Sequence, residues 1–80
     1  MSNTARYKAA FVNTFRVSEE EVANLAYQSI EKWDSLGHMQ LMGELEEAFD
    51  IEMDIDDITD FSDYKKGKEI LQRYGVTFDG

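Results

Sequence analysis

Three segments of this chain place apolar side chains at the spacing of an α-helix, and this pattern restricts the fold more than any other feature. The segments are residues 3–15, 35–50 and 63–74. Within each, large apolar residues recur three or four positions apart, which puts them along one side of a helix. The chain also has no proline and only five glycines, so little interrupts helical backbone. We therefore predict an all-α protein.

Length and composition describe one small domain that spans residues 1–80. Apolar and aromatic residues make up 42% of the chain, which is normal for a protein with a buried core and argues against disorder. The sequence lacks cysteine, so neither a disulfide nor a protein thiol can contribute. Side-chain packing must therefore hold a small core without disulfides.

Residues 3–15 are predicted to form the first helix, with Asn3 or Thr4 as its cap. Its inward side carries Tyr7, Ala10, Phe11, Thr14 and Phe15. Residues 18–21, Ser-Glu-Glu-Glu, have the spacing of a capping box, so a helical turn is expected to begin there. Residues 24–32 show no period and are interpreted as a long, partly ordered loop that covers the core. Its anchors would be Leu25, Tyr27 and Ile30.

The second helix is predicted over residues 35–50, with Asp34 as its N-cap. On a helical projection its inward side carries His38, Leu41, Met42, Leu45, Ala48 and Phe49. The outward side carries Leu36, Met39, Gln40, Gly43, Glu46, Glu47 and Asp50. Leu36 and Met39 are large apolar residues on the side that should face water. Such a pair beside carboxylates is typical of a contact patch with an acidic rim, although single exposed apolar residues are also common.

The segment of residues 51–61 is ambiguous, because its first apolar residues alternate as in a strand. A single short strand would have no partner. We therefore predict a loop followed by a short helix from about residue 56 to residue 61. The inward side chains of this segment would be Ile55, Ile58 and Phe61.

Residues 63–74 are predicted to form the last helix, capped by Ser62 or Asp63 and ended by Gly75. Its inward side carries Tyr64, Gly67, Ile70, Leu71 and Tyr74. The glycine on this side lowers helix propensity, and close helix–helix approach would compensate for it. Residues 76–80 are expected to form a disordered tail.

The formal net charge of −9 is concentrated in the second half of the chain. From Asp34 to Asp63, with both of these residues included, there are 11 carboxylates and no lysine or arginine. This charge repels nucleic acid and anionic membranes and attracts basic protein surfaces.

No apolar run is long enough for a signal peptide or a membrane span, so we expect a cytoplasmic protein. We also expect it to be a monomer. An EF-hand loop started at Asp50 or Asp54 lacks the required glycine and closing glutamate, and no metal site is predicted.

Ser35 is the main candidate for a functional residue. With Asp34 as the cap, its hydroxyl is not needed for capping, and a helix N-terminus suits an attached anionic group. The alternative is an ordinary serine at a helix start. His38 is the only histidine and lies near the inward side, so no catalytic triad is complete and we expect no enzymatic activity. His38 is interpreted as a packing or partner-contact residue, and Trp33 either covers the core or borders a group carried by Ser35.

The residues around Ser35 resemble the acyl carrier protein family. The shared features are Asp34-Ser35-Leu36, then Leu41, Glu44-Leu45-Glu46-Glu47 and Phe49-Asp50-Ile51. The segment 17–22, Val-Ser-Glu-Glu-Glu-Val, is similar to the family's loop after its first helix, so the likeness covers nearly the whole chain. The triplet alone is weakly specific. Followed by an acidic helix in an acidic, cysteine-free chain, it is fairly specific.

This resemblance implies a four-helix bundle with a short third helix, and a function as a carrier of acyl groups. Ser35 would receive a 4′-phosphopantetheine arm from coenzyme A through a Mg²⁺-dependent phosphopantetheinyl transferase, and acyl groups would be carried on the arm as thioesters. The other partners implied are acyl-loading and acyl-processing enzymes with basic docking patches. Their contact residues would be Asp34, Leu36, Met39, Gln40, Gly43, Glu46 and Glu47.

Several residues differ from those of the usual fatty-acid carriers. Gln40 stands where a carboxylate is usual, Gly43 stands where a larger apolar residue is frequent, and Trp33 and His38 replace smaller residues. These differences favour a specialised carrier in a lipid, surface-glycan or secondary-metabolite pathway. The alternatives are an aminoacyl or peptidyl carrier and a small acidic interaction module without an arm.

Overall fold

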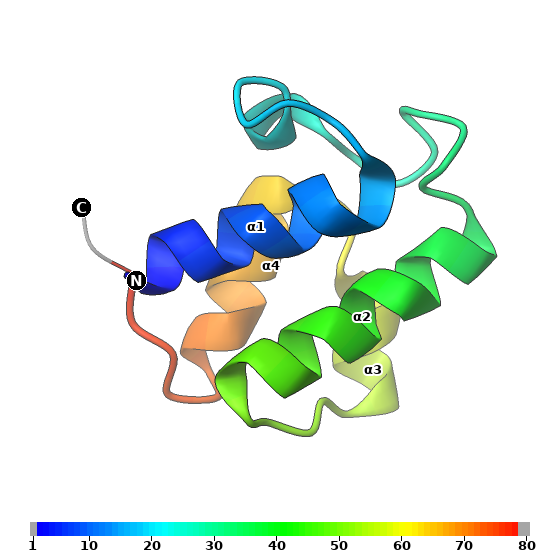
Figure 1. Cartoon of the computed structure of the whole chain (residues 1–80). Helices are drawn as coiled ribbons and strands as arrows, with labels where there is room; N and C mark the ends of the chain where they lie inside the picture. Colours follow the sequence, from blue (N-terminus) through cyan, green and yellow to red (C-terminus); the bar gives the residue numbers. More distant parts are fainter. Residues whose placement is uncertain (1, 79–80) are drawn as a thin grey trace.

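The computed structural model describes residues 2–78 and is helical. The helices are α1 (Asn3–Phe15), a 3₁₀ turn η1 (Val22–Asn24), α2 (Ser35–Phe49), α3 (Ile55–Asp60) and α4 (Tyr64–Gln72). In Figure 1, α1 and α2 lie side by side and run in opposite directions, and the long α1–α2 connection runs back above α1 before it returns to the start of α2. Within the described range there is no strand, only one isolated bridge between Ala26 and Asp63. The predicted all-α, four-helix architecture with a short third helix is confirmed.

Side-chain caps begin three of the four helices. Asp34 accepts a hydrogen bond from the Gly37 N–H at 2.8 Å, and Asp63 accepts one from the Lys66 N–H at 2.6 Å, both as predicted. The prediction for α1 was wrong by one residue. Ser2, and neither Asn3 nor Thr4, is the N-cap, because its hydroxyl oxygen accepts the Ala5 N–H at 3.1 Å.

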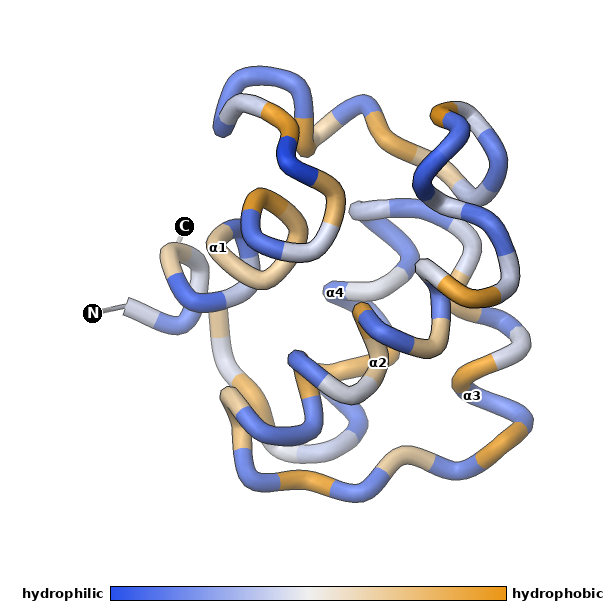
Figure 2. Tube along the Cα trace, turned by 45° about the vertical axis from the view of Figure 1, so that its right-hand side comes forward, coloured by the Kyte–Doolittle hydropathy of each residue, from blue (hydrophilic) through white to orange (hydrophobic). Residues whose placement is uncertain are grey.

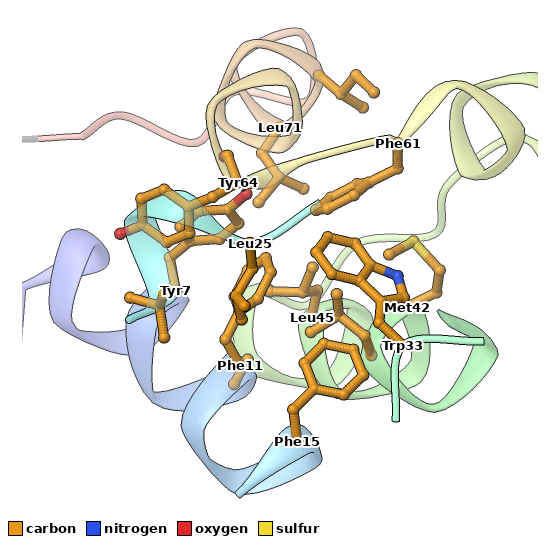
Figure 3. Close-up of a cluster of buried hydrophobic side chains, with 14 of the residues drawn as sticks. Tyr7, Phe11, Phe15, Leu25, Trp33, Met42, Leu45, Phe61, Tyr64 and Leu71 are labelled. Carbon is orange, nitrogen blue, oxygen red and sulfur yellow. Dashed lines mark hydrogen bonds between the residues drawn. The ribbon is translucent and has the colours of Figure 1, made fainter. Parts of the chain in front are cut away.

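The core is a cluster of aromatic rings with aliphatic residues around it (Figure 3). Its largest fully buried members are Trp33, Tyr7, Phe11, Phe15, Phe61, Leu41, Met42, Leu45, Ile70, Leu71 and Val22. Gly67 allows this packing, since a Cβ there would lie 2.2 Å from both the Phe61 ring and the Tyr7 hydroxyl oxygen. The groups that approach Gly67 are therefore two side chains, whereas close approach of two helices was predicted. With that space free, the Tyr7 hydroxyl donates to the Tyr64 carbonyl at 2.6 Å.

One inward position of α2 was predicted wrongly. Ala48 is exposed, whereas Leu41, Met42 and Leu45 are buried. Ala48 lines a shallow groove of about 170 Å³ between α1 and α2. Its small side chain lies at the edge of the α1–α2 contact and leaves this groove open.

The helix α3 and the segment before it alternate between hydrophilic and hydrophobic residues (Figure 2). Ile55 was predicted to face inward, but it begins α3 and is 78% exposed. Ile58 is half-buried and Phe61 is buried, as expected. The helix α3 begins at Ile55, one residue earlier than predicted. Because side chains in a helix tilt toward its N-terminus, the Ile55 side chain extends beyond the first turn and into solvent.

Tyr74, two residues after the end of α4, holds α3 in place. The Tyr74 hydroxyl donates to Asp57 Oδ2 at 2.5 Å and accepts the Asp54 N–H at 2.8 Å. The hydrogen bond to Asp57 is the main reason why the pKa of Tyr74 is raised above its usual value. Arg73 adds an ion pair to Asp57 at 3.4 Å.

Residues 76–78 are not the disordered tail that was predicted. Gly75 has a left-handed φ of 87°, and after it the chain folds back over the core. Val76 is buried, and the half-buried Phe78 ring lies 5.3 Å from the Tyr7 ring. The Asn3 side chain donates to the Thr77 carbonyl at 2.9 Å, which joins the two ends of the described chain. The remainder of the predicted tail, residues 79–80, lies outside the described residues.

Candidate functional site around Ser35

The α1–α2 connection ends beside Ser35 and is held by backbone hydrogen bonds. The Tyr27 N–H donates to the Ser62 carbonyl at 2.8 Å, and the Gln28 N–H donates to the Trp33 carbonyl at 2.9 Å. Gln28 itself has a left-handed φ of 67°, a conformation that non-glycine residues adopt rarely. Within the predicted loop, Leu25 is buried and Ile30 packs on the core, but the Tyr27 side chain points outward. The loop therefore covers the core and also presents Tyr27 beside α2.

Ser35 is exposed at the first position of α2. Because Asp34 caps the helix, the Ser35 hydroxyl makes no capping bond, as the sequence predicted. Its oxygen lies 3.1 Å from the Tyr27 hydroxyl oxygen, within hydrogen-bond distance. Among residues 2–78, no protein group accepts the backbone N–H of Ser35 or Leu36. The site therefore combines an accessible hydroxyl with two unpaired donors at the positive end of a 15-residue helix.

Trp33 and His38 form a hydrogen-bonded pair under this site. Trp33 is fully buried and stacks on Phe15, so the core alternative for Trp33 is the correct one. Its indole N–H donates to His38 Nδ1 at 2.9 Å. Since Nδ1 accepts, Nε2 must carry the proton, and it donates to the Ile58 carbonyl at 2.7 Å. With both ring nitrogens engaged, His38 fixes the start of α2 to α3 and has no nitrogen free to accept the Ser35 proton.

Gly37 fixes the position of the loop that leads into the site. A Cβ at this position would lie 2.0 Å from the Lys32 carbonyl oxygen and 3.2 Å from the Phe15 ring. Only glycine allows the chain before Asp34 to lie this close to α2. Gly37 was given no role from the sequence, because the Lys32 carbonyl that lies against it belongs to the preceding loop, whose path the helical spacing does not predict.

The residues predicted to contact partners lie on α2, but their surroundings differ. Leu36 is 70% exposed and Met39 is 55% exposed, so both apolar side chains face solvent as predicted. An open groove of about 560 Å³ between the end of α1 and α2 includes Met39, Gln40, Gly43 and Glu47 in its lining. Glu46 is half-buried instead, and its carboxylate accepts the Met53 N–H at 2.8 Å. Asp34 likewise has one carboxylate oxygen committed to the helix cap.

A pocket of about 230 Å³ lies next to Ser35 and was not predicted from the sequence. Its lining comes from the loop, α2, α3 and the segment before α4: Tyr27, His38, Thr59, Phe61 and Ser62. The Tyr27 and Phe61 rings supply apolar surface, whereas the hydroxyl groups and the imidazole add polar atoms. Tyr27 therefore contacts both Ser35 and the pocket.

Residues 2–78 contain neither a metal-binding cluster nor a membrane-spanning helix. No group of three or more histidine, aspartate or glutamate side chains is arranged to hold a metal ion there. No helix in this part of the chain has the length and apolar character needed to cross a membrane. Comparisons with family models, curated proteins and solved structures found no match to this chain.

Proposed function

We propose that this chain is an acyl carrier protein whose Ser35 is modified with 4′-phosphopantetheine. The observation that carries the proposal is the exposed Ser35 hydroxyl at the start of α2, relieved of capping by Asp34 and flanked by exposed Leu36. The resemblance of the surrounding sequence to acyl carrier proteins agrees with this geometry. The chain itself then performs no catalysis.

The modification transfers one phosphoryl-linked group from coenzyme A to Ser35. The Ser35 oxygen forms a bond to the phosphorus on the pantetheine side of the pyrophosphate, and the bond from this phosphorus to the bridging oxygen breaks. Adenosine 3′,5′-bisphosphate leaves, and the Ser35 proton passes to a base. His38 cannot be that base, because both of its ring nitrogens are engaged elsewhere, so the transferase would supply the base and bind the Mg²⁺.

The residues at the start of α2 fit an attached phosphodiester. The unpaired N–H groups of Ser35 and Leu36, together with the positive end of the helix, favour an anion at this place. Exposure of Ser35 leaves the hydroxyl accessible to another protein. When bound, the arm supplies the thiol that the sequence lacks, and this thiol holds an acyl group as a thioester.

The partners of the carrier would dock on the outer face of α2. Leu36 and Met39 offer apolar contact area, and Glu47 lies among the many carboxylates of the acidic segment. This combination fits enzymes with a basic patch around a small apolar contact, including the transferase and acyl-processing enzymes. Charge of this kind speeds association more than it tightens binding, which suits a carrier that must leave each enzyme.

The proposal is tested by incubating the protein with coenzyme A, Mg²⁺ and a broad-specificity phosphopantetheinyl transferase. Intact mass should increase by one phosphopantetheine group. The Ser35→Ala variant should stay unmodified, whereas the control Ser18→Ala, another exposed serine that does not line the pocket beside Ser35, should react as the wild type does. A wild-type chain that stays unmodified while a control carrier reacts would disprove the proposal.

A further inference from the structure

Tyr27 is held in a fixed position beside Ser35 by the loop around it. Its backbone N–H bonds to the Ser62 carbonyl, and the Ala26 N–H bonds to the Ser29 hydroxyl at 2.9 Å. The left-handed Gln28 follows it, so the chain turns sharply after Tyr27. This local arrangement points the Tyr27 side chain, 37% exposed, away from the core.

The Tyr27 ring occupies the space between Ser35 and the neighbouring pocket. Its centroid lies 5.4 Å from that of His38 in an edge-on contact at 73°. The same ring lines the pocket, while its hydroxyl oxygen lies 3.1 Å from Ser35 Oγ. The His38 contact fixes the ring orientation, since His38 is itself bonded through both nitrogens.

We propose that Tyr27 is a positioning residue that binds the phosphodiester attached to Ser35. This inference rests on the proposed function. Once Ser35 Oγ is esterified it has no proton, so in the modified protein only the Tyr27 hydroxyl can donate between the two residues. The anionic oxygens on the phosphorus bonded to Oγ are stronger acceptors than the ester oxygen, and a hydrogen bond to them is charge-assisted.

This contact would determine how the arm leaves the protein. A phosphodiester held by Tyr27 begins at the ring that forms one wall of the pocket. The arm then starts next to Thr59 and Ser62 rather than at the opposite side of α2, where Gln40 and Gly43 line the other groove. Tyr27 thereby limits the orientations of the arm without taking part in its chemistry.

The test uses ³¹P NMR of the modified full chain. Wild type, Tyr27→Phe and Tyr64→Phe are each loaded with phosphopantetheine and compared. Tyr27→Phe keeps the ring and loses only the hydroxyl, so its phosphorus signal should move in chemical shift and become narrower as the phosphodiester gains mobility. Tyr64→Phe loses a tyrosine hydroxyl on α4, where the ring packs on Tyr7 and does not line the pocket, and should give the wild-type signal.

A second measurement uses the wild type alone, so that a change in folding caused by a substitution cannot affect the test of Tyr27. The ¹³Cζ resonance of Tyr27 reports on its hydroxyl, and it should shift when wild type is converted from the unmodified to the modified form. Superimposable phosphorus signals of wild type and Tyr27→Phe, or an unchanged Cζ resonance, would overturn the role of Tyr27 while the carrier function stands. A wild type that takes up no phosphorus would overturn both.

Discussion

The substitution Gly37→Ala should destabilise the protein, although alanine is the better helix former. A Cβ at Gly37 would lie 2.0 Å from the Lys32 carbonyl oxygen, and contacts below 3.0 Å are essentially never seen. The loop backbone must therefore retreat by about 1 Å, and overpacking of this kind costs roughly 1–3 kcal/mol. The gain in helix propensity offsets about 1 kcal/mol of that cost. We expect a net loss of about 1–2 kcal/mol because the obstacle is backbone.

The same substitution at Gly43 provides the matched control. Gly43 lies in the same helix, is exposed, and has no atom within 4 Å of the place its Cβ would occupy. Gly43→Ala should therefore stabilise the protein by about 0.5–1 kcal/mol. Two identical changes six positions apart should thus shift stability in opposite directions.

Urea unfolding followed by circular dichroism at 222 nm measures both variants. The midpoint should fall for Gly37→Ala and rise for Gly43→Ala, with slopes like that of wild type. Thermal midpoints should separate by about 6 °C or more, since 1 kcal/mol corresponds to roughly 4–8 °C in a domain of this size. Equal stabilisation of both variants would show that the loop does not lie against Gly37 in solution.

Two further changes test the core around the site and the packing of α1. His38→Phe keeps a ring but leaves the buried Trp33 indole N–H and the Ile58 carbonyl without partners. Urea unfolding should therefore show that the free energy of unfolding falls by roughly 1–3 kcal/mol. An unchanged urea midpoint would mean that the two hydrogen bonds of His38 are absent in solution. Burial is the main cause that raises the pKa of Tyr7 far above its usual value. Its contribution to stability is therefore complete below the unfolded-state pKa of about 10 and declines at higher pH, by about 1.4 kcal/mol per pH unit. Unfolding measured between pH 9 and about pH 11 should show this decline in wild type and a smaller one in Tyr7→Phe, and parallel curves would contradict the assignment.

Local signals in the sequence predicted the helices well. The spacing of apolar residues and the caps Asp34 and Asp63 depend only on neighbours within one turn, so they can be read without knowing the fold. The exposure of Leu36 and Met39 followed from the same periodicity. Errors of one residue at Ser2 and Ile55, and of two residues at the end of α4, which stops at Gln72 and not at residue 74, are of the size expected for helix ends.

Features that depend on contacts between distant segments could not be read this way. The pocket beside Ser35 joins Tyr27 to Phe61, which are far apart in the sequence. Phe78 packs on Tyr7 only when the whole bundle is in place. From the sequence alone, the short segment of residues 76–80 was therefore predicted to be a tail. Gly37 illustrates the same limit, because its importance comes from the Lys32 carbonyl and not from its own helix.

The way α3 is attached has a consequence for motion. This six-residue helix has no fully buried side chain, and side-chain bonds from His38 and Tyr74 hold it to its neighbours. Segments with so few buried contacts open locally at a lower free energy than the whole protein unfolds, so the amides of α3 should exchange with solvent earlier than those of α1. Thr59 of α3 is part of the pocket wall beside Ser35. We therefore expect the size of that pocket to change when α3 opens locally.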